Sequence, residues 1–251
     1  MPGGFAAKPC GGFAAKPVLV LAGTAEARAL LERARGLGIV ASLAGRTERA
    51  DLPVHTRRGG FGGDAGFRAA LAGVAAVLDA THPFAAVISE RAARLCAEAG
   101  MPHLRLARPP WPVEPGWSVH PTLDAAAEAL PAGARVLLAV GPGGVAPFLG
   151  RGLALWCRRI DAAPPIGGAA WIVGRPGAAA DEAALMRGLA ITHLVTKNAG
   201  GAGRGKLDAA RALGIAVHVV ARPPGPPGEE TADADRALAF IRAHAPRPDH
   251  N

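Results

Sequence analysis

The sequence has few residues that could cross-link the chain or anchor it in a membrane. Its three cysteines are far apart and form no C-x-x-C pair, and its eight histidines show no metal-ligand spacing, so neither a disulfide framework nor a metal site is indicated. No run approaches the ~18 uninterrupted apolar residues of a membrane-spanning helix. The first seventeen residues lack the apolar segment of a signal peptide. We therefore expect a cytoplasmic protein with reduced thiols and no membrane contact.

Aromatic residues and clustered basic residues are also scarce. Only 4% of the residues are aromatic, tyrosine is absent, and the net charge of +8 is spread along the chain. No basic block exceeds Arg57-Arg58 or Arg158-Arg159. A nucleic-acid-binding protein usually clusters basic residues among aromatic ones, so no nucleic-acid partner is expected. The diffuse positive charge better fits a small polyanionic ligand.

The length and the apolar content bound the domain organisation. The chain has 251 residues, of which 50% are hydrophobic, which suits one large domain or two of ordinary size. The heptapeptide GGFAAKP occurs at residues 3–9 and again at 11–17, without a periodicity that could bury one face. We interpret residues 1–16 as a flexible extension. A proline-rich segment near residues 109–116 then suggests two domains, residues 17–112 and residues 113–251.

Within each expected domain, short apolar runs alternate with helical patterns. The expected strands are residues 18–22, 39–43, 74–78, 103–106, 136–140, 153–157, 171–174, 191–196 and 216–220. The expected helices are residues 24–36, 83–99, 179–188, 206–213 and 231–243, with another that begins near residue 64. This alternation predicts α/β domains whose parallel sheets are covered by helices on both faces.

The loops that follow the strands are the expected ligand sites, because ligands of open parallel sheets bind beyond the carboxyl ends of the strands. Gly23 and Thr24 follow the first strand, where a dinucleotide pyrophosphate is commonly held, although a tight turn with Thr24 as a helix cap explains them equally well. Glu26 suits the first helical turn without a ligand and could also bond a sugar hydroxyl. Gly60 and Gly62 lie in a glycine-rich loop that allows close backbone approach to a cofactor.

The end of the second strand distinguishes between cofactors. NAD sites and many S-adenosylmethionine sites need an acidic residue there, whereas this chain has Arg46 and Thr47. A guanidinium at this position suits the 2′-phosphate of NADP(H). A solvated surface arginine is the alternative interpretation.

Two further strand ends carry polar side chains. His82 follows the third predicted strand and precedes Pro83, which suits a first helical turn at the ligand edge. Lys197 and Asn198 follow a strand of the second domain and combine one of four lysines with one of two asparagines. The glycines at 200 and 201 come directly after them. A structural histidine and a basic turn are the alternatives that assign these residues no catalytic role.

Taken together, these segments resemble the precorrin-6A reductases of cobalamin biosynthesis over roughly residues 17–245. The matching stretches, in chain order, are VLVLAGTAEARAL, AGRT, RGGFGG, DATHPFA, LRLARPPW, LVTKNAGG, KLDAAR and VVARP. The pair DATHPFA and TKNAGG is the most specific. One departure is Ala199, where many relatives carry serine, which puts in doubt an essential side-chain role at that position.

The resemblance implies a function, and the places of the polar and glycine residues after the strands suggest its site. Such enzymes have two Rossmann-like domains with a ligand cleft between them, and use NADPH to reduce one double bond of the precorrin-6A macrocycle to precorrin-6B. The substrate is a polycarboxylate tetrapyrrole, and neighbouring enzymes of the pathway are candidate partners. His82 and Lys197 would be catalytic. The residues expected to bind the cofactor are Gly23, Thr24, Glu26, Arg46, Thr47, Gly60, Gly62, Asn198, Gly200 and Gly201.

Three other functions stay open at this point. The first is reduction of the cobalt-containing analogue, cobalt-precorrin-6A, which the sequence does not separate from the metal-free substrate. The second is a methyltransferase that uses S-adenosylmethionine, against which the missing acidic residue after the second strand argues. The third is a non-enzymatic protein that binds NADP or nucleic acid.

Overall fold

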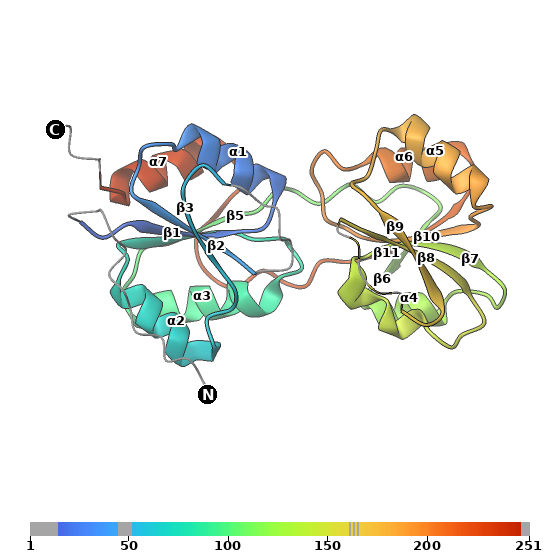
Figure 1. The fold of residues 1–251 in the computed structure, drawn as a ribbon, viewed down its shortest axis with the longest axis horizontal. Coiled ribbons are helices and arrows are strands. Elements are labelled where there is room, and N and C mark those ends of the chain that lie inside the picture. Colours follow the sequence, from blue (N-terminus) through green and yellow to red (C-terminus); the bar gives the residue numbers. More distant parts are fainter. Residues whose placement is uncertain (1–14, 45–51, 161, 163, 165, 247–251) are drawn as a thin grey trace. The chain divides into compact units, whose positions relative to one another are not determined.

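The chain forms two compact units (Figure 1). The structure, a computed structural model, describes residues 15–44, 52–160, 162, 164 and 166–246. Unit 1 comprises the residues up to Arg108 together with those from Pro224 onward, and unit 2 comprises Pro109–Pro223. Each unit holds one six-stranded sheet of parallel strands with helices on its faces, which confirms the predicted fold class.

Unit 1 has the strand order β12-β5-β4-β1-β2-β3. This is the doubly wound order of dinucleotide-binding domains, in which the chain reverses direction across the sheet between β1 and β4. Its strands are β1 (Val18–Ala22), β2 (Ile39–Leu43), β3 (His55–Arg58), β4 (Ala76–Ala80), β5 (His103–Leu106) and β12 (Glu230–Thr231). Its helices are α1 (Ala25–Arg33), α2 (Gly63–Ala72), α3 (Ala86–Glu98) and α7 (Ala234–His244).

Helices cover both faces of this sheet. On one face α1 and α7 pack on alternate residues of β1 and β4, and on the other face α2 and α3 pack on the residues between them. Every residue of β1 and of β4 is consequently buried. A strand that is buried on both faces reads as a continuous apolar run, which is why VLVLA was recognisable in the sequence.

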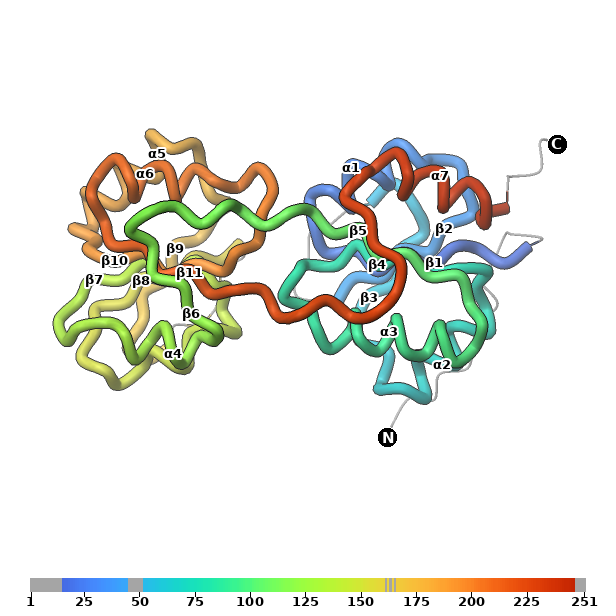
Figure 2. Tube along the Cα trace, turned by 180° about the vertical axis from the view of Figure 1, so that it is seen from behind, coloured from blue at the N-terminus to red at the C-terminus, as the bar shows by residue number. Residues whose placement is uncertain are grey.

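The end of the chain returns to unit 1. Ala237, Leu238 and Ile241 of α7 are buried in the same core as the apolar side chains of α1, and α7 lies beside α1 in both views (Figures 1 and 2). The strand β12 extends the sheet by pairing with β5. This arrangement differs from the expected second domain of residues 113–251, because the apolar stripe of α7 is buried against β1 and β4 rather than against the sheet that precedes it in sequence.

Unit 2 has the order β6-β11-β10-β7-β8-β9 with a reversal between β7 and β10. Five of its strands follow the order of unit 1, and the sixth position, beside β11, is taken by β6, the first strand of the unit. Its strands are β6 (Trp117–His120), β7 (Arg135–Ala139), β8 (Ala154–Arg159), β9 (Ala169–Val173), β10 (His193–Lys197) and β11 (Ala216–Val220). Its helices are α4 (Leu123–Glu128), α5 (Ala179–Gly188) and α6 (Gly205–Ala212), with short 3-10 turns η1 (Pro142–Gly144) and η2 (Ala146–Phe148). Across the described parts of both units, no helix combines the length and the apolar character that crossing a bilayer requires.

Three strands were not expected from the sequence, and all three lie at the edges of the sheets. They are β3, β6 and β12. Only one side of an edge strand is hydrogen-bonded to a neighbour, and the exposed and partly buried residues of β3 carry no apolar run. Such strands leave little trace in a pattern of hydrophobicity.

A close backbone contact shapes the glycine-rich loop between β3 and α2. A Cβ atom at Gly66, inside α2, would overlap the carbonyl oxygen of Phe61 in the loop. Phe61 also meets the fully buried ring of Phe67, with ring centroids 4.7 Å apart in an edge-to-face arrangement. The missing side chain at Gly66 therefore lets the loop fold back on its own helix.

We expect Gly66→Ala to destabilise the protein by about 2 kcal/mol, because the overlap with Phe61 outweighs the better helix propensity of alanine. Gly188→Ala is the matched control, since nothing in the structure approaches a Cβ atom at Gly188, within α5. It should leave stability unchanged or raise it by up to about 1 kcal/mol. Urea unfolding of both variants measures the difference. Equal unfolding midpoints for the two variants would contradict the packing described for the loop.

Three histidines form a row on the sheet of unit 2. His120 Nε2 lies 3.0 Å from His218 Nδ1, and the ring centroids of His193 and His218 are 5.5 Å apart. Burial of His218, together with the smaller effects of the neighbouring His120 and His193, lowers its pKa to about 4. Within the described residues, no group of three or more histidine, cysteine, aspartate or glutamate side chains is placed to hold a metal ion.

The low pKa of His218 predicts a loss of stability in mild acid. The unfolded chain takes up a proton below its ordinary pKa of 6.5, whereas folded His218 stays neutral down to about pH 4. The free energy of unfolding should therefore fall over this interval, by up to about 3 kcal/mol from this residue. In His218→Gln the fall should be smaller, with His55→Gln on the edge strand β3 as the control for losing one histidine. An identical pH dependence of urea unfolding in His218→Gln and the parent protein would refute this.

Candidate functional site

The strand-end loops of unit 1 meet at the reversal point between β1 and β4. Thr24 caps α1: its Oγ1 accepts a hydrogen bond from the backbone N of Ala27 at 3.0 Å and donates one to the carbonyl oxygen of Ala80, at the end of β4, at 3.1 Å. A Cβ atom at Gly23 would lie 3.6 Å from the backbone N of His82. The structure thus brings together Gly23, Thr24 and His82, as their strand-end positions predicted.

Packing within the protein does not require glycine at position 23. The distance of 3.6 Å from a Cβ atom to the nearest backbone atom is an ordinary van der Waals contact. An alanine would therefore fit against the protein itself. The bare backbone at Gly23 leaves open the edge at which α1 begins, where backbone N–H groups and the helix dipole favour a negatively charged ligand.

Glu26 forms an ion pair with Arg108, which follows β5. Both residues line a small pocket at the carboxyl ends of β1, β4 and β5, together with Thr24, Thr81, Pro83, Leu106 and Ala107. The pair offsets the charge that Glu26 would otherwise present to an anion at the start of α1. Glu26 therefore lies at the expected edge, with its carboxylate already bound to a cation.

The loop that carries Gly60 and Gly62 follows the neighbouring strand β3. Arg57 donates to Ser42 Oγ of β2 at 2.7 Å and to the carbonyl oxygen of Gly60 at 2.9 Å, and its guanidinium lies 4.0 Å from the centroid of the Phe61 ring. Gly62 adopts φ +74° directly before α2, a conformation that favours glycine. These interactions connect the loop to the end of β2. Arg46 and Thr47, the expected ribose-phosphate contacts beyond β2, lie outside the described residues.

The loop that carries His82 is fastened by a buried carboxylate. Asp79 is 1% exposed at the end of β4, and its Oδ1 accepts a hydrogen bond from the backbone N of Thr81 at 3.0 Å. Thr81 Oγ1 lies 3.0 Å from Ser89 Oγ of α3. His82 Nδ1 accepts a hydrogen bond from the backbone N of Phe84 at 3.2 Å, so the proton of the neutral imidazole resides on Nε2. His82 therefore presents a hydrogen-bond donor at Nε2.

Two buried polar atoms of the unit 1 sheet have no hydrogen-bond partner among the described residues. They are Asp79 Oδ2 and His103 Nε2, on the adjacent strands β4 and β5. Arg105 Nε is 3.8 Å from Asp79 Oδ2, which is an ion-pair distance. Burial lowers the pKa of His103, and the charge of Asp79 offsets this effect only in part. Asp79 was not among the site residues predicted from the sequence, although a carboxylate at the end of an apolar strand was a visible signal.

The second group of expected residues lies in unit 2, after β10. Lys197 is partly buried at the end of β10, beside the reversal point between β7 and β10. Asn198 is 6% exposed, and its side-chain amide bonds both backbone groups of Trp111: Oδ1 accepts from the backbone N at 2.8 Å, and Nδ2 donates to the carbonyl oxygen at 3.0 Å. The carbonyl oxygen of Gly201 accepts from Trp111 Nε1 at 2.8 Å. Asn198 and Gly201 thus have structural partners in unit 2, whereas they were expected to contact the cofactor.

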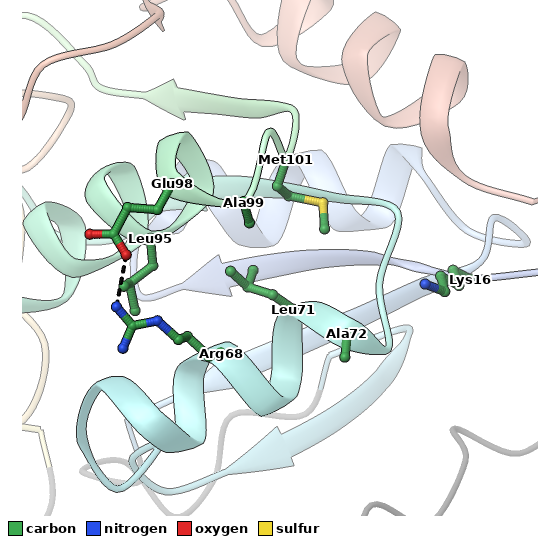
Figure 3. A pocket seen from close by; sticks show the side chains of 8 residues that line it. All are labelled: Lys16, Arg68, Leu71, Ala72, Leu95, Glu98, Ala99 and Met101. Atoms are coloured by element: carbon green, nitrogen blue, oxygen red, sulfur yellow. Dashed lines mark hydrogen bonds and ion pairs between the residues drawn. The ribbon is translucent and has the colours of Figure 1, made fainter.

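A second pocket lies between the ends of α2 and α3 (Figure 3). Leu71, Ala72, Leu95, Ala99 and Met101 form its apolar lining, and Lys16, Arg68 and Glu98 form its polar lining. Lys16 and Met101 come before β1 and β5 respectively, which places this pocket at the amino-terminal edge of the sheet. It contains none of the expected site residues, and ligands of such sheets bind at the opposite edge.

Comparison with known proteins identifies the family of this chain. A family model described as "Precorrin-6x reductase CbiJ/CobK" matches residues 17–242. The chain is 46% identical to a precorrin-6A reductase of Rhodococcus erythropolis over 240 residues, which cover 89% of this chain and 96% of the relative. It is 42% identical to a precorrin-6A reductase of Mycobacterium tuberculosis over 243 residues, which cover 91% and 98% respectively.

A solved structure has the same fold. The structure of CobK precorrin-6A reductase superposes with a TM-score of 0.84 at 37% identity, covering 94% of this chain and the whole of that chain. The chain therefore belongs to the precorrin-6x reductase CbiJ/CobK family of oxidoreductases.

Proposed function

We propose that this protein is an NADPH-dependent precorrin-6A reductase that forms precorrin-6B in cobalamin biosynthesis. Its family membership supports the reaction, and the relatives with 46% and 42% identity are named for the metal-free substrate. The structural observation that carries the proposal is the meeting of Gly23, Thr24 and His82 at the reversal point of a doubly wound sheet.

The residues of unit 1 fit a nicotinamide dinucleotide. Gly23 and Thr24 would place its pyrophosphate at the N-terminus of α1, and Gly60 and Gly62 would allow a close backbone approach from the neighbouring loop. Glu26 would accept a hydrogen bond from a ribose hydroxyl, since Arg108 offsets its charge. We assign the 2′-phosphate of NADPH to Arg46, with Thr47 beside it. When bound, this cofactor supplies the hydride.

The protein's own part in the reaction is to bind, orient and protonate. We propose that His82 donates a hydrogen bond from Nε2 to the reacting ligand, because its Nδ1 is held by the backbone of Phe84. Lys197 offers an ammonium group at the carboxyl edge of unit 2 for a substrate carboxylate. The net charge of +8 favours the approach of a polycarboxylate.

We propose that Asn198 and Gly201 do not contact the cofactor directly. The side-chain amide of Asn198 and the backbone carbonyl oxygen of Gly201 already bind Trp111. A cytoplasmic location belongs to the proposal as well and is consistent with the free buried thiols of Cys96 and Cys157. Neighbouring enzymes of the pathway are proposed partners for transfer of the macrocycle.

The direct test is incubation of the protein with NADPH and precorrin-6A. We expect loss of the near-ultraviolet absorbance of NADPH together with a colour change of the macrocycle. A parallel reaction with cobalt-precorrin-6A distinguishes the two substrates, and binding of S-adenosylmethionine in place of NADPH would indicate a methyltransferase. Absence of NADPH oxidation with both macrocycles would contradict the proposed reaction.

The assignment of Arg46 predicts a change in cofactor preference. Arg46→Ala should weaken NADPH binding by about 10- to 100-fold and leave NADH binding nearly unchanged, because only NADPH carries the 2′-phosphate. Arg35→Ala is the control, since Arg35 is an exposed arginine of unit 1 that pairs with Glu32. Fluorescence titrations with both cofactors give the dissociation constants. Equal weakening for the two cofactors would remove the assignment.

The roles of His82 and Lys197 predict a loss of turnover. His82→Ala and Lys197→Ala should each lower kcat/KM by about 100-fold, the scale of a lost catalytic proton or charge contact. Lys16→Ala, at the opposite edge of the unit 1 sheet, should keep the parent rate. Steady-state rates over a range of precorrin-6A concentrations provide the comparison. Unchanged turnover in both variants would exclude these residues from the active site.

A further inference from the structure

The chain crosses between the two units twice, after Arg108 and after Pro223, and both crossing segments are bound to one loop of unit 2. This loop, Asn198 to Gly201, follows β10 and the partly buried Lys197. Asn198 pairs with the backbone N and O of Trp111 as a second peptide group would, although 87 residues separate the two. The first crossing segment is therefore held to the loop by a side chain that imitates strand pairing.

Trp111 is fixed on further sides. Its Nε1 donates to the carbonyl oxygen of Gly201 at 2.8 Å, and Lys206 Nζ lies 4.6 Å from the centroid of its ring. Both Trp111 and Lys206 are 7% exposed. The ammonium group of Lys206 also donates to the carbonyl oxygen of Gly203 at 2.8 Å. The indole thus contacts the loop through Gly201 and the start of α6 through Lys206.

Arg222 connects the second crossing segment to the same loop. Its Nε donates to the carbonyl oxygen of Asn198 at 2.8 Å, and its Nη2 donates to that of Ala199 at 2.8 Å and to that of Pro109 at 3.1 Å. One guanidinium thus bonds the loop at two points and the first crossing segment at a third. Its fixed fork geometry suits this bridging, which a single ammonium group reproduces poorly.

Gly200 makes the close approach possible. It adopts φ +66°, and a Cβ atom there would overlap the carbonyl oxygen of Pro109. The glycine is therefore explained by the contact between the loop and the first crossing segment. The side-chain and backbone groups of this loop are hydrogen-bonded to the crossing segments, and Lys197 directly precedes the loop.

We propose that Asn198, Trp111 and Arg222 are positioning residues of the reductase, which hold Lys197 in place by fastening its loop to both crossing segments. This inference rests on the proposed function, in which Lys197 binds a substrate carboxylate. The backbone of Lys197 is paired in register with Val220, and the backbone N of Asn198 bonds the carbonyl oxygen of Val220 at 2.9 Å. With the next residue fixed by Trp111, the side chain of Lys197 starts from a defined point, which matters because displacements near 1 Å in an active site can cost about 100-fold in rate.

The test uses two conservative substitutions in the full-length protein. Asn198→Asp keeps the shape of the side chain but places an oxygen against the carbonyl oxygen of Trp111, and Arg222→Lys keeps the charge but loses the fork. Arg135→Lys is the matched control, because Arg135 also donates two hydrogen bonds to one carbonyl oxygen, that of Leu189, from the opposite end of the unit 2 sheet. Each variant is measured for precorrin-6A turnover, NADPH dissociation constant, folded fraction at the assay temperature, and hydrogen exchange at the backbone amide of Trp111.

We expect the exchange of the Trp111 amide to accelerate in Asn198→Asp. In both Asn198→Asp and Arg222→Lys, kcat should fall by about tenfold or more while the NADPH dissociation constant stays within about twofold and the folded fraction is unchanged. The control should keep the parent kcat. If both variants keep the kcat of the parent protein although the Trp111 amide exchanges faster in Asn198→Asp, the positioning role is overturned.

A fall in kcat that follows the folded fraction in Arg222→Lys also overturns it, since the contacts would then serve stability alone. These outcomes differ from failure of the proposed function, in which the parent protein itself shows no turnover with NADPH and precorrin-6A. The positioning role would then fall together with that function.

Discussion

The geometry of a parallel sheet that reverses direction controls where chemistry can occur in this protein. All carboxyl ends of parallel strands lie at one edge, and the connections that leave β1 and β4 pass to opposite faces of the sheet, α1 to one and α3 to the other. In sheets of this kind ligands bind between these connections, where helix N-termini favour negatively charged groups. Gly23, Thr24 and His82 lie there because the strand order places them there. Five strands of unit 2 follow the same order, with Lys197 beside the reversal point between β7 and β10.

Hydrogen bonds between side chains and backbone hold the loops at these edges. Thr24 bonds the end of β4, Asp79 bonds the backbone of the His82 loop, and Arg222 bonds three carbonyl oxygens around the loop after β10. Each of these side chains satisfies backbone groups that a loop cannot pair within a sheet or a helix. Two glycines complete the arrangement, since a side chain at Gly66 would overlap the carbonyl oxygen of Phe61, and one at Gly200 would overlap that of Pro109. The Thr24 and Asn198 loops are therefore held by residues distant in sequence, whereas the Phe61 and His82 loops are also shaped by local contacts.

The difference between buried strands and loops held by distant contacts explains which features could be predicted from the sequence. Strands buried on both faces, such as β1 and β4, carry continuous apolar runs, so the α/β class and the strand-end positions of Gly23 and His82 were predictable. The edge strand β12 has two residues and no such run, and the return of α7 to unit 1 depends on which of two similar cores buries its apolar stripe. The partner of Asn198 could not be predicted, because no local pattern links it to Trp111, 87 residues away.

We propose that the nicotinamide dinucleotide binds at the carboxyl edge of the unit 1 sheet, and the other assignments depend on this site. The most direct measurement is a titration of isotopically labelled protein with NADPH, following backbone amide signals by NMR. The account predicts the largest shifts at Gly23, Thr24 and His82, with little change at Met101 and Arg68 between the ends of α2 and α3. Shifts centred on that second pocket, with the signals of Gly23 and His82 unmoved, would contradict it.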